Sequence, residues 1–219
     1  MISKTYRLIS PKQIRVDLVD ETLGKNQVVV KPTYLSICAA DERYYTGSRG
    51  EEVMKKKLPM ALIHESVGEV IFDPSGEFKV GTKVVMIPNT PVEKDEVIRE
   101  NYLRSSVFKS SGYDGFMRDV VIMDKIRIIP YNNVEDRVAV LLELISVSIN
   151  ALDNFKKHAH KRRNTIGVWG DGSVGFITAL ILKYNLPDSK VFVFGHVPEK
   201  MQYFQFCDGV YSSNETGIS

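Results

Sequence analysis

Apolar and polar residues follow two different periodicities along this 219-residue chain, and the change comes near Val134. The first part contains short β-branched runs separated by Gly, Pro, Asn and Asp, which is typical of strands joined by turns. These runs cover residues 13–19, 27–37, 65–72, 82–88, 115–123 and 125–130. Because no helical spacing alternates with them, the pattern predicts a β-barrel or sandwich.

After Val134 the apolar residues recur at helical spacing, and residues 135–159 are acidic early and basic late, as the helix dipole favours. We expect one helix there and place a domain junction inside it, near residue 150. A strand at 165–170, an apolar helix at 176–186 and a strand at 190–195 follow. The sequence therefore predicts an α/β protein, with a largely β domain at 1–150 and part of a doubly wound dinucleotide-binding domain at 151–219.

Composition and charge exclude several classes of function. The net charge is only +2, from 29 basic and 27 acidic residues, so no global field favours nucleic acid or an anionic membrane. The basic run at 156–163 follows a helix and precedes a strand, where solvated cations are common.

Neither a signal peptide nor a bilayer-spanning stretch is evident, so we expect a cytoplasmic protein. The two cysteines, Cys38 and Cys207, lie in unlike segments and do not suggest a disulfide framework.

A glycine motif joins the first predicted strand of the second domain to its helix. Gly170, Gly172 and Gly175 form G-x-G-x-x-G, with Ser173 and Val174 between the last two. In this context the first glycine permits the tight turn, the second lets a pyrophosphate approach the backbone, and the third lets helix and strand pack closely. The alternative is a glycine-rich turn that binds no ligand.

The end of the second strand of this domain bears on the choice of cofactor. An NAD-selective fold places an Asp or Glu there, on the ribose 2′-hydroxyl. The chain has Gly195 instead, followed by His196 and then Lys200. The missing acid and the positive charge favour NADPH, although both basic residues are also compatible with an ordinary surface.

Three residues of different chemistry form a second candidate site. Cys38 follows the run at 27–37, and His64 and Glu65 precede the run at 65–72. A thiolate, an imidazole and a carboxylate can together hold zinc, and an open fourth position would make the site catalytic. Buried cysteines and structural histidines are common, so the residues alone leave both interpretations open.

Several segments resemble a known family. The motifs at 38–41 (CAAD), 63–70 (IHESVGEV) and 83–88 (KVVMIP), the LLEL helix around Glu143 and the glycine motif are similar to those of medium-chain alcohol and polyol dehydrogenases. The segments at 41–47, 55–66, 86–89 and 110–119 more narrowly resemble the alcohol-dehydrogenase-like ribulose-5-phosphate reductases, also called ribitol-5-phosphate dehydrogenases, of teichoic-acid and capsule synthesis.

The resemblance implies a GroES-like catalytic domain followed by a Rossmann domain. It also implies that Cys38 and His64 bind a catalytic zinc, that Glu65 and Glu143 supply carboxylate ligands or exchange with water, and that Asp41 orients His64. Zinc would polarise the ketone oxygen while NADPH delivers a hydride.

The chain departs from the family pattern at three points. Ala40 replaces a relay hydroxyl, so a proton must pass through water, Tyr44, Glu65 or a substrate hydroxyl. Ile63 replaces the glycine that usually precedes His-Glu, and we expect a strand end to accommodate it. A structural zinc lobe with four cysteines is absent, because the chain has only two cysteines.

The leading hypothesis is reduction of D-ribulose 5-phosphate to D-ribitol 5-phosphate with NADPH. The alternatives are a generic polyol dehydrogenase and a non-catalytic binding module. Expected partners are a phosphorylated pentulose, a second copy in a homodimer, and a ribitol-5-phosphate cytidylyltransferase, with no nucleic acid or membrane.

The chain ends after about one βαβ unit of a fold that needs two halves, so we expect residues 1–219 alone to be inactive. Candidate phosphate contacts are Arg43, Arg49, Lys55, Lys56 and Lys57.

Overall fold

The computed structural model describes residues 1–213 and divides into two compact units, Met1–Leu142 and Glu143–Ser219. The division comes at the start of the long helix α4 (Leu142–His158), earlier than the residue 150 expected from the sequence. Ser148 of α4, which precedes residue 150, accepts a hydrogen bond from the Thr178 hydroxyl of the second unit at 3.0 Å, so this part of the helix packs with the second unit. Residues 214–219 of the predicted second domain lie outside the described residues.

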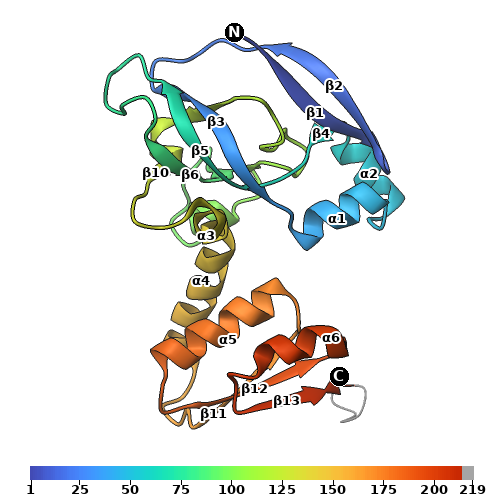
Figure 1. The fold of residues 1–219 in the computed structure, drawn as a ribbon, viewed down its shortest axis with the longest axis vertical. Helices are drawn as coiled ribbons and strands as arrows, with labels where there is room; N and C mark the ends of the chain where they lie inside the picture. Colours follow the sequence, from blue (N-terminus) through green and yellow to red (C-terminus); the bar gives the residue numbers. More distant parts are fainter. Residues whose placement is uncertain (214–219) are drawn as a thin grey trace. The chain divides into compact units, whose positions relative to one another are not determined.

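The first unit is mostly antiparallel sheet (Figure 1). A five-stranded sheet has the order β10-β6-β5-β3-β9, and a three-stranded sheet has the order β2-β1-β4. The strands are β1 (Ile2–Ser10), β2 (Gln13–Asp20), β3 (Gln27–Ser36), β4 (Met60–Ala61), β5 (Glu65–Phe72), β6 (Lys83–Met86), β7 (Asn89–Thr90), β8 (Val107–Phe108), β9 (Val121–Asp124) and β10 (Ile128–Pro130). The helices are α1 (Ala39–Thr46), α2 (Glu51–Lys57) and α3 (Asp136–Ala139), with 3-10 turns η1 (Glu100–Tyr102) and η2 (Lys125–Arg127).

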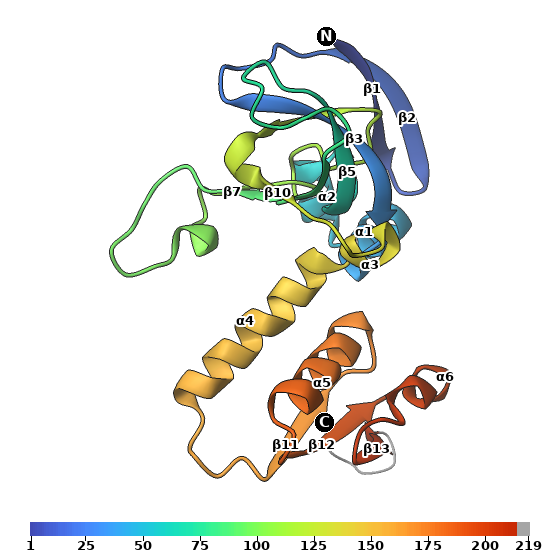
Figure 2. The same ribbon diagram turned by 60° about the vertical axis from the view of Figure 1, so that its left-hand side comes forward.

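Alternating apolar residues of these strands form the core of the first unit. Val28 and Val30 of β3 and Val70 of β5 are fully buried, as expected for strands with one face on a core. Phe116 joins the same core although it lies outside any strand. Figure 2 shows that the segment after β7 projects from this unit as a long loop.

The expected strand at 115–123 is wrong in its first half. Only Val121–Asp124 forms a strand, β9. The backbone N–H groups of Gly115, Phe116 and Met117 donate instead to the carbonyls of residues 61, 63 and 62, at 2.7 to 3.2 Å. An ideal Cβ on Gly115 would lie 2.3 Å from the Ile63 carbonyl oxygen, so this close approach requires glycine.

The single helix expected over 135–159 is two helices, α3 and α4. Ala139 and Val140 are buried against Val67 and Val85 of the first unit, and the helix is interrupted by a turn at residues 140–141 before α4 begins. At the other end of α4 the Arg163 guanidinium donates to the carbonyls of Lys156 (2.6 Å) and Ala159 (3.3 Å). Part of the basic run therefore caps a helix C-terminus, where cations are favoured.

The second unit has the predicted strand–turn–helix–strand order, followed by a third strand. Its strands are parallel in the order β11-β12-β13. Ala179 and Leu182 of the apolar helix pack on the sheet residues Ile166, Val168 and Val193. The elements are β11 (Thr165–Trp169), α5 (Ser173–Asn185), β12 (Lys190–Gly195), α6 (Pro198–Met201), the 3-10 turn η3 (Gln202–Phe204) and β13 (Gly209–Ser212). Across both units, the described residues include no helix of sufficient length and hydropathy to cross a bilayer.

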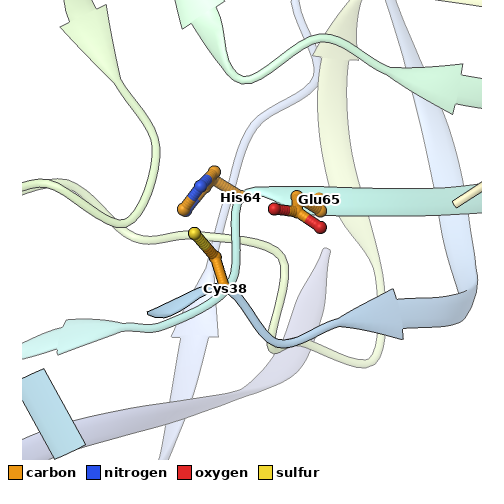
Figure 3. Close-up of side chains that lie close together, drawn as sticks. All are labelled: Cys38, His64 and Glu65. Atoms are coloured by element: carbon orange, nitrogen blue, oxygen red, sulfur yellow. The ribbon is translucent and has the colours of Figure 1, made fainter. Parts of the chain in front are cut away.

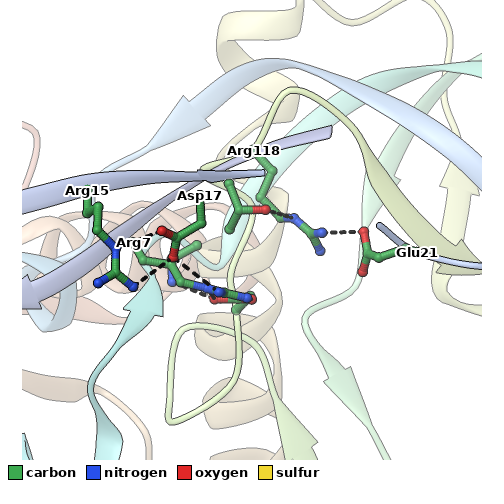
Figure 4. Close-up of polar contacts among 8 residues, drawn as sticks. Arg7, Arg15, Asp17, Glu21 and Arg118 are labelled. Atoms are coloured by element: carbon green, nitrogen blue, oxygen red, sulfur yellow. Dashed lines mark hydrogen bonds and ion pairs between the residues drawn. The ribbon is translucent and has the colours of Figure 1, made fainter. Parts of the chain in front are cut away.

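Ion pairs connect the three-stranded sheet to the loop that contains Asp114. Figure 4 shows Arg7 and Arg15 on either side of Asp17, and Arg118 bound to Glu21. Arg7 also holds Asp114 through Nε (3.0 Å) and Nη2 (2.6 Å). Asp114 in turn accepts the Ala61 N–H at 2.8 Å, so the pair links β1, β4 and the loop.

Asp114→Asn should lower the free energy of unfolding at neutral pH by about 2 kcal/mol, the worth of a charge-assisted hydrogen bond. Burial alone would raise the pKa of Asp114, but the bonds from Arg7 and the Ala61 N–H outweigh burial and lower it. This stabilisation is therefore full above the unfolded-state pKa of about 3.9 and is lost as pH falls through the lower folded-state pKa.

Urea denaturation of wild type and variant at several pH values measures this difference. The two stabilities should converge as the carboxylate becomes protonated. Asp20→Asn, at a side chain 75% exposed, is the matched control and should change stability by less than about 0.5 kcal/mol. A difference for Asp114→Asn that stays constant down to the lowest pH would contradict the electrostatic explanation.

Candidate functional site

Cys38, His64 and Glu65 come together in the first unit (Figure 3). Cys38 lies between β3 and α1, and His64 and Glu65 lie where the chain enters β5. One ligand atom from each residue lies within 4.8 Å of the others. Glu65 is buried and His64 is nearly so, at 1% and 8% exposed, and Cys38 is half-buried. The thiol, imidazole and carboxylate together fit the donor preferences of zinc.

The backbone before His64 adopts a conformation that the sequence does not suggest. Ile63 has φ 74°, in the left-handed region that a β-branched residue rarely adopts. The expectation that a strand end accommodates Ile63 is therefore wrong, because β4 ends at Ala61 and β5 starts at Glu65. Long-range hydrogen bonds hold this turn: the Ile63 N–H donates to Asp41 Oδ1 (2.9 Å), and its carbonyl accepts from the Phe116 N–H (2.7 Å).

Asp41 lies behind the site and is 2% exposed. Its Oδ2 accepts the Cys38 N–H (3.2 Å) and lies 3.6 Å from His64 Nδ1. Burial alone would raise the pKa of Asp41, but hydrogen bonds from His64, Ser110 and Ile63 outweigh burial and lower it. A carboxylate against Nδ1 fixes the ring and leaves Nε2 for a ligand, as in metal sites with an outer carboxylate.

His64 is strongly shifted by the same contacts. Burial lowers its pKa, but the hydrogen bonds to Asp41 and Cys38 outweigh burial and raise the pKa of His64 to about 10. This shift favours the charged imidazolium form of His64, and a metal that binds the ring must displace a proton.

The other residues predicted for the first site are placed less directly. Tyr44 is 4% exposed and packs in the core, with the Arg49 guanidinium 4.8 Å from its ring centroid. Glu143 lies in the first turn of α4 and belongs to the second unit. Their roles in proton transfer and metal binding stay predictions.

Three of the five candidate phosphate contacts already have protein partners, and the partner of Arg49 is the Tyr44 ring. Lys55 pairs with Glu51 across one helical turn at 2.8 Å. Lys57 Nζ donates to the Ser111 carbonyl at 2.8 Å. Arg43 and Lys56 are exposed, so the structure leaves these two as the freer candidates.

In the second unit each glycine of the motif has its own geometry. Gly170 has φ 129°, which favours glycine. An ideal Cβ on Gly175 would lie 2.0 Å from the Gly170 carbonyl oxygen, so Gly175 is required for β11 and α5 to meet. Gly172 is the N-cap of α5, with open space around it and Ser173 and Val174 in the first turn. The backbone N–H groups of a helix N-terminus suit a phosphate at this point.

The end of β12 differs from the sequence-based expectation, because a carboxylate does lie there. Asp171, inside the glycine motif, accepts the backbone N–H groups of His196 (2.7 Å) and Val197 (2.6 Å). An ideal Cβ on Gly195 would lie 2.8 Å from Asp171 Oδ2, so Asp171 explains the glycine at this position. The sequence-based prediction missed Asp171, and the signal that could have found it is the acidic residue between the first two motif glycines.

His196 is further held by Ser213, whose Oγ donates to the Gly195 carbonyl (3.0 Å) and lies 2.6 Å from His196 Nδ1. His196 Nε2 lies 3.5 Å from the same hydroxyl oxygen, so Ser213 holds the ring beside the end of β12. Lys200 lies nearby in sequence, on α6.

Comparison with known proteins identifies relatives of this chain. The family model of the alcohol dehydrogenase GroES-like domain matches residues 24–133. The chain is 57% identical to a ribulose-5-phosphate reductase of Bacillus spizizenii, over 98% of this chain and 63% of that protein. It is 49% identical to ribulose-5-phosphate reductase 1 of Staphylococcus aureus, with the same two coverages. The chain thus spans less than two thirds of the length of these relatives.

Solved structures show the same similarity. The crystal structure of S. aureus TarJ in complex with NADPH superposes with a TM-score of 0.78 and 41% identity, over 98% of this chain and 60% of that chain. L-idonate 5-dehydrogenase of Escherichia coli superposes with a TM-score of 0.83 at 21% identity, over 97% of this chain and 63% of that chain. This second similarity concerns the fold alone.

Proposed function

The chain belongs to the family of the alcohol dehydrogenase GroES-like domain, and from this premise we propose that it is part of a zinc-dependent reductase. The proposed reaction is conversion of D-ribulose 5-phosphate to D-ribitol 5-phosphate with NADPH. In this proposal residues 1–150 form the GroES-like catalytic domain, and residues 151–219 form the first part of the Rossmann domain. The reductase relatives, at 49% and 57% identity, support the choice of substrate.

One observation carries the proposal: the ligand atoms of Cys38, His64 and Glu65 lie within 4.8 Å of one another, with Asp41 behind His64. We propose that these three residues hold zinc and that Glu143 supplies a further carboxylate or exchanges with water. Bound zinc supplies a Lewis acid for the ketone oxygen, and NADPH supplies the hydride. Asp41 keeps the His64 ring oriented, and the buried position of Glu65 limits water around the donor set.

The proton for the new alkoxide has a restricted set of sources. Ala40 offers no hydroxyl, and Tyr44 packs in the core. We therefore propose that water, a substrate hydroxyl or Glu65 delivers the proton, with the buried Tyr44 as the remaining candidate.

For the cofactor, we propose that the motif loop binds the pyrophosphate and that the end of β12 binds the 2′-phosphate of NADPH. Asp171 fixes the loop after β12, and its charge is offset by two backbone N–H groups. We propose that Lys200 supplies positive charge for the phosphate and that the His196 side chain contacts it. The proposed contacts are Gly170, Gly172, Ser173, Val174, Gly175, Gly195, His196 and Lys200.

We extend the proposal to partners. A ribitol-5-phosphate cytidylyltransferase would consume the product in teichoic-acid or capsule synthesis, and the reductase would act as a homodimer. Size-exclusion chromatography with light scattering tests the second point directly.

NADPH oxidation by a form of this protein that contains both halves of the Rossmann domain, with ribulose 5-phosphate, ribulose or fructose as substrate, tests the activity. We expect kcat/KM to be at least about 100-fold higher with the phosphorylated substrate, because two charge-assisted hydrogen bonds to phosphate are worth about 3 kcal/mol. NADPH should also be preferred to NADH. Equal rates for ribulose and ribulose 5-phosphate would instead indicate a polyol dehydrogenase. NADPH binding without turnover would indicate a binding module.

A further inference from the structure

Ser110 lies in the loop between β8 and β9 and is 4% exposed. Its hydroxyl donates to Asp41 Oδ1 at 2.7 Å, across 69 residues of sequence. Its backbone has φ 61°, in the left-handed region. A buried serine with an uncommon backbone conformation thus contacts the carboxylate behind the donor set.

The loop that carries Ser110 is fixed on several sides. The Ser110 N–H donates to the Tyr113 carbonyl (3.0 Å), and Lys57 Nζ donates to the Ser111 carbonyl (2.8 Å). Two residues earlier, the Phe108 ring lies 5.4 Å from the His64 ring, centroid to centroid. Strand β8 therefore contacts His64 through Phe108, and the loop after it contacts, through Ser110, the Asp41 carboxylate that faces His64.

The two oxygens of Asp41 have different partners. Oδ1 accepts from two groups that shape the scaffold, the Ser110 hydroxyl and the Ile63 N–H. Oδ2 faces the Cys38 N–H and His64 Nδ1, both from residues of the donor set. Fixing Oδ1 therefore sets the direction in which Oδ2 points toward the imidazole. We propose that Ser110 is a positioning residue of the metal centre, whose hydroxyl orients Asp41 and, through Asp41, His64.

The backbone conformation of Ser110 supports this role. A left-handed conformation is unfavourable for a residue with a Cβ and costs nothing for glycine. Glycine at position 110 would suit the backbone better, but it would lack the hydroxyl. Strain that is kept at a buried residue beside a site is an observation from which function can be inferred.

The proposal rests on the zinc site of the proposed function, and its test separates stability from metal affinity. Ser110→Gly removes the hydroxyl and relieves the backbone, whereas Ser110→Ala removes the hydroxyl and keeps the strain. Lys12→Gly is the matched control, because Lys12 has φ 62° in an exposed turn. For each protein we would measure the metal-free unfolding midpoint, the Zn²⁺ affinity by chelator competition, and the absorption spectrum of the Co²⁺ form.

We expect Ser110→Gly to unfold near the wild-type midpoint but to bind Zn²⁺ about tenfold more weakly, at the lower end of the range for outer partners of metal ligands. Its Co²⁺ spectrum should shift, because the imidazole is less fixed. Ser110→Ala should lose both stability and affinity, and Lys12→Gly should lose neither. If the role of Ser110 were purely structural, the Zn²⁺ affinity of each variant would fall only when its unfolding midpoint falls.

Wild-type affinity and an unchanged Co²⁺ spectrum in Ser110→Gly would overturn the role of Ser110 while leaving the zinc site in place. A wild-type protein that binds no Zn²⁺ stoichiometrically would overturn the zinc site itself, and the role of Ser110 with it. The two failures are therefore distinguishable.

Discussion

Cys38→Ser should abolish stoichiometric zinc binding by this protein while leaving its fold intact. The thiolate is a first-rank zinc ligand and the serine hydroxyl is not, since it stays protonated at neutral pH. Loss of an outer partner alone weakens metal binding by about 10- to 100-fold, so loss of a ligand should exceed about 100-fold. Metal analysis after dialysis against a weak chelator measures the effect.

The fold should survive because Cys38 has a second, replaceable role. It is the N-cap of α1, where its Sγ accepts the Ala40 N–H at 3.5 Å. Serine is a strongly preferred N-cap residue, so the helix keeps its cap. The matched control is Cys207→Ser, at a half-buried cysteine of the second unit, which should retain the metal. Full zinc occupancy in Cys38→Ser with normal circular dichroism would show that the ligand set is assigned wrongly.

Gly175→Ala should unfold or severely destabilise the second unit, by about 3 kcal/mol or more. The added Cβ would lie 2.0 Å from the Gly170 carbonyl oxygen and 2.9 Å from its carbon. Both atoms are backbone, so β11 and α5 must separate, and overpacking of this kind costs about 1–3 kcal/mol even among adaptable side chains. Thermal denaturation, followed by the fluorescence of Trp169 on β11, measures the loss.

Gly172→Ala is the matched control within the same motif. An ideal Cβ at Gly172 meets nothing within 4 Å, and the residue has an ordinary φ of −85°. The variant should therefore fold like the wild type but bind NADPH more weakly, because in the proposed cofactor site the new methyl group would lie where the pyrophosphate approaches the helix N-terminus. If Gly175→Ala melted like Gly172→Ala, close helix–strand packing would not be the reason for the third glycine.

Many strands and helices of this protein can be predicted from the sequence, because the pattern of apolar and polar residues that predicts them is local. Alternating apolar residues predicted β2, β3, β5 and β6, and the run 165–195 predicted the strand–turn–helix–strand unit. Charged residues within the N-terminal segment obscured β1, although its hydrogen bonds with β2 extend from Ile2 to Ser10. The short helices α1 and α2 were missed because each spans only about two turns.

The residues of the candidate sites also divide into those that the sequence predicts and those that only the structure reveals. Residue type and family resemblance singled out Cys38, His64 and Glu65 before any geometry was known. They also singled out the three motif glycines, whose spacing has a direct steric meaning. Neither source indicated Ser110, because its partner Asp41 is 69 residues away in sequence.

What the sequence by itself determined is the set of elements with strong periodicity and the chemistry of the donor residues. Only the tertiary structure decided that Ile63 is left-handed, that Asp171 occupies the end of β12, and that Ser110 reaches Asp41. Each of these depends on hydrogen bonds between segments distant in sequence. Such bonds form only when the whole chain closes around its core, and no local pattern of apolar and polar residues encodes their geometry.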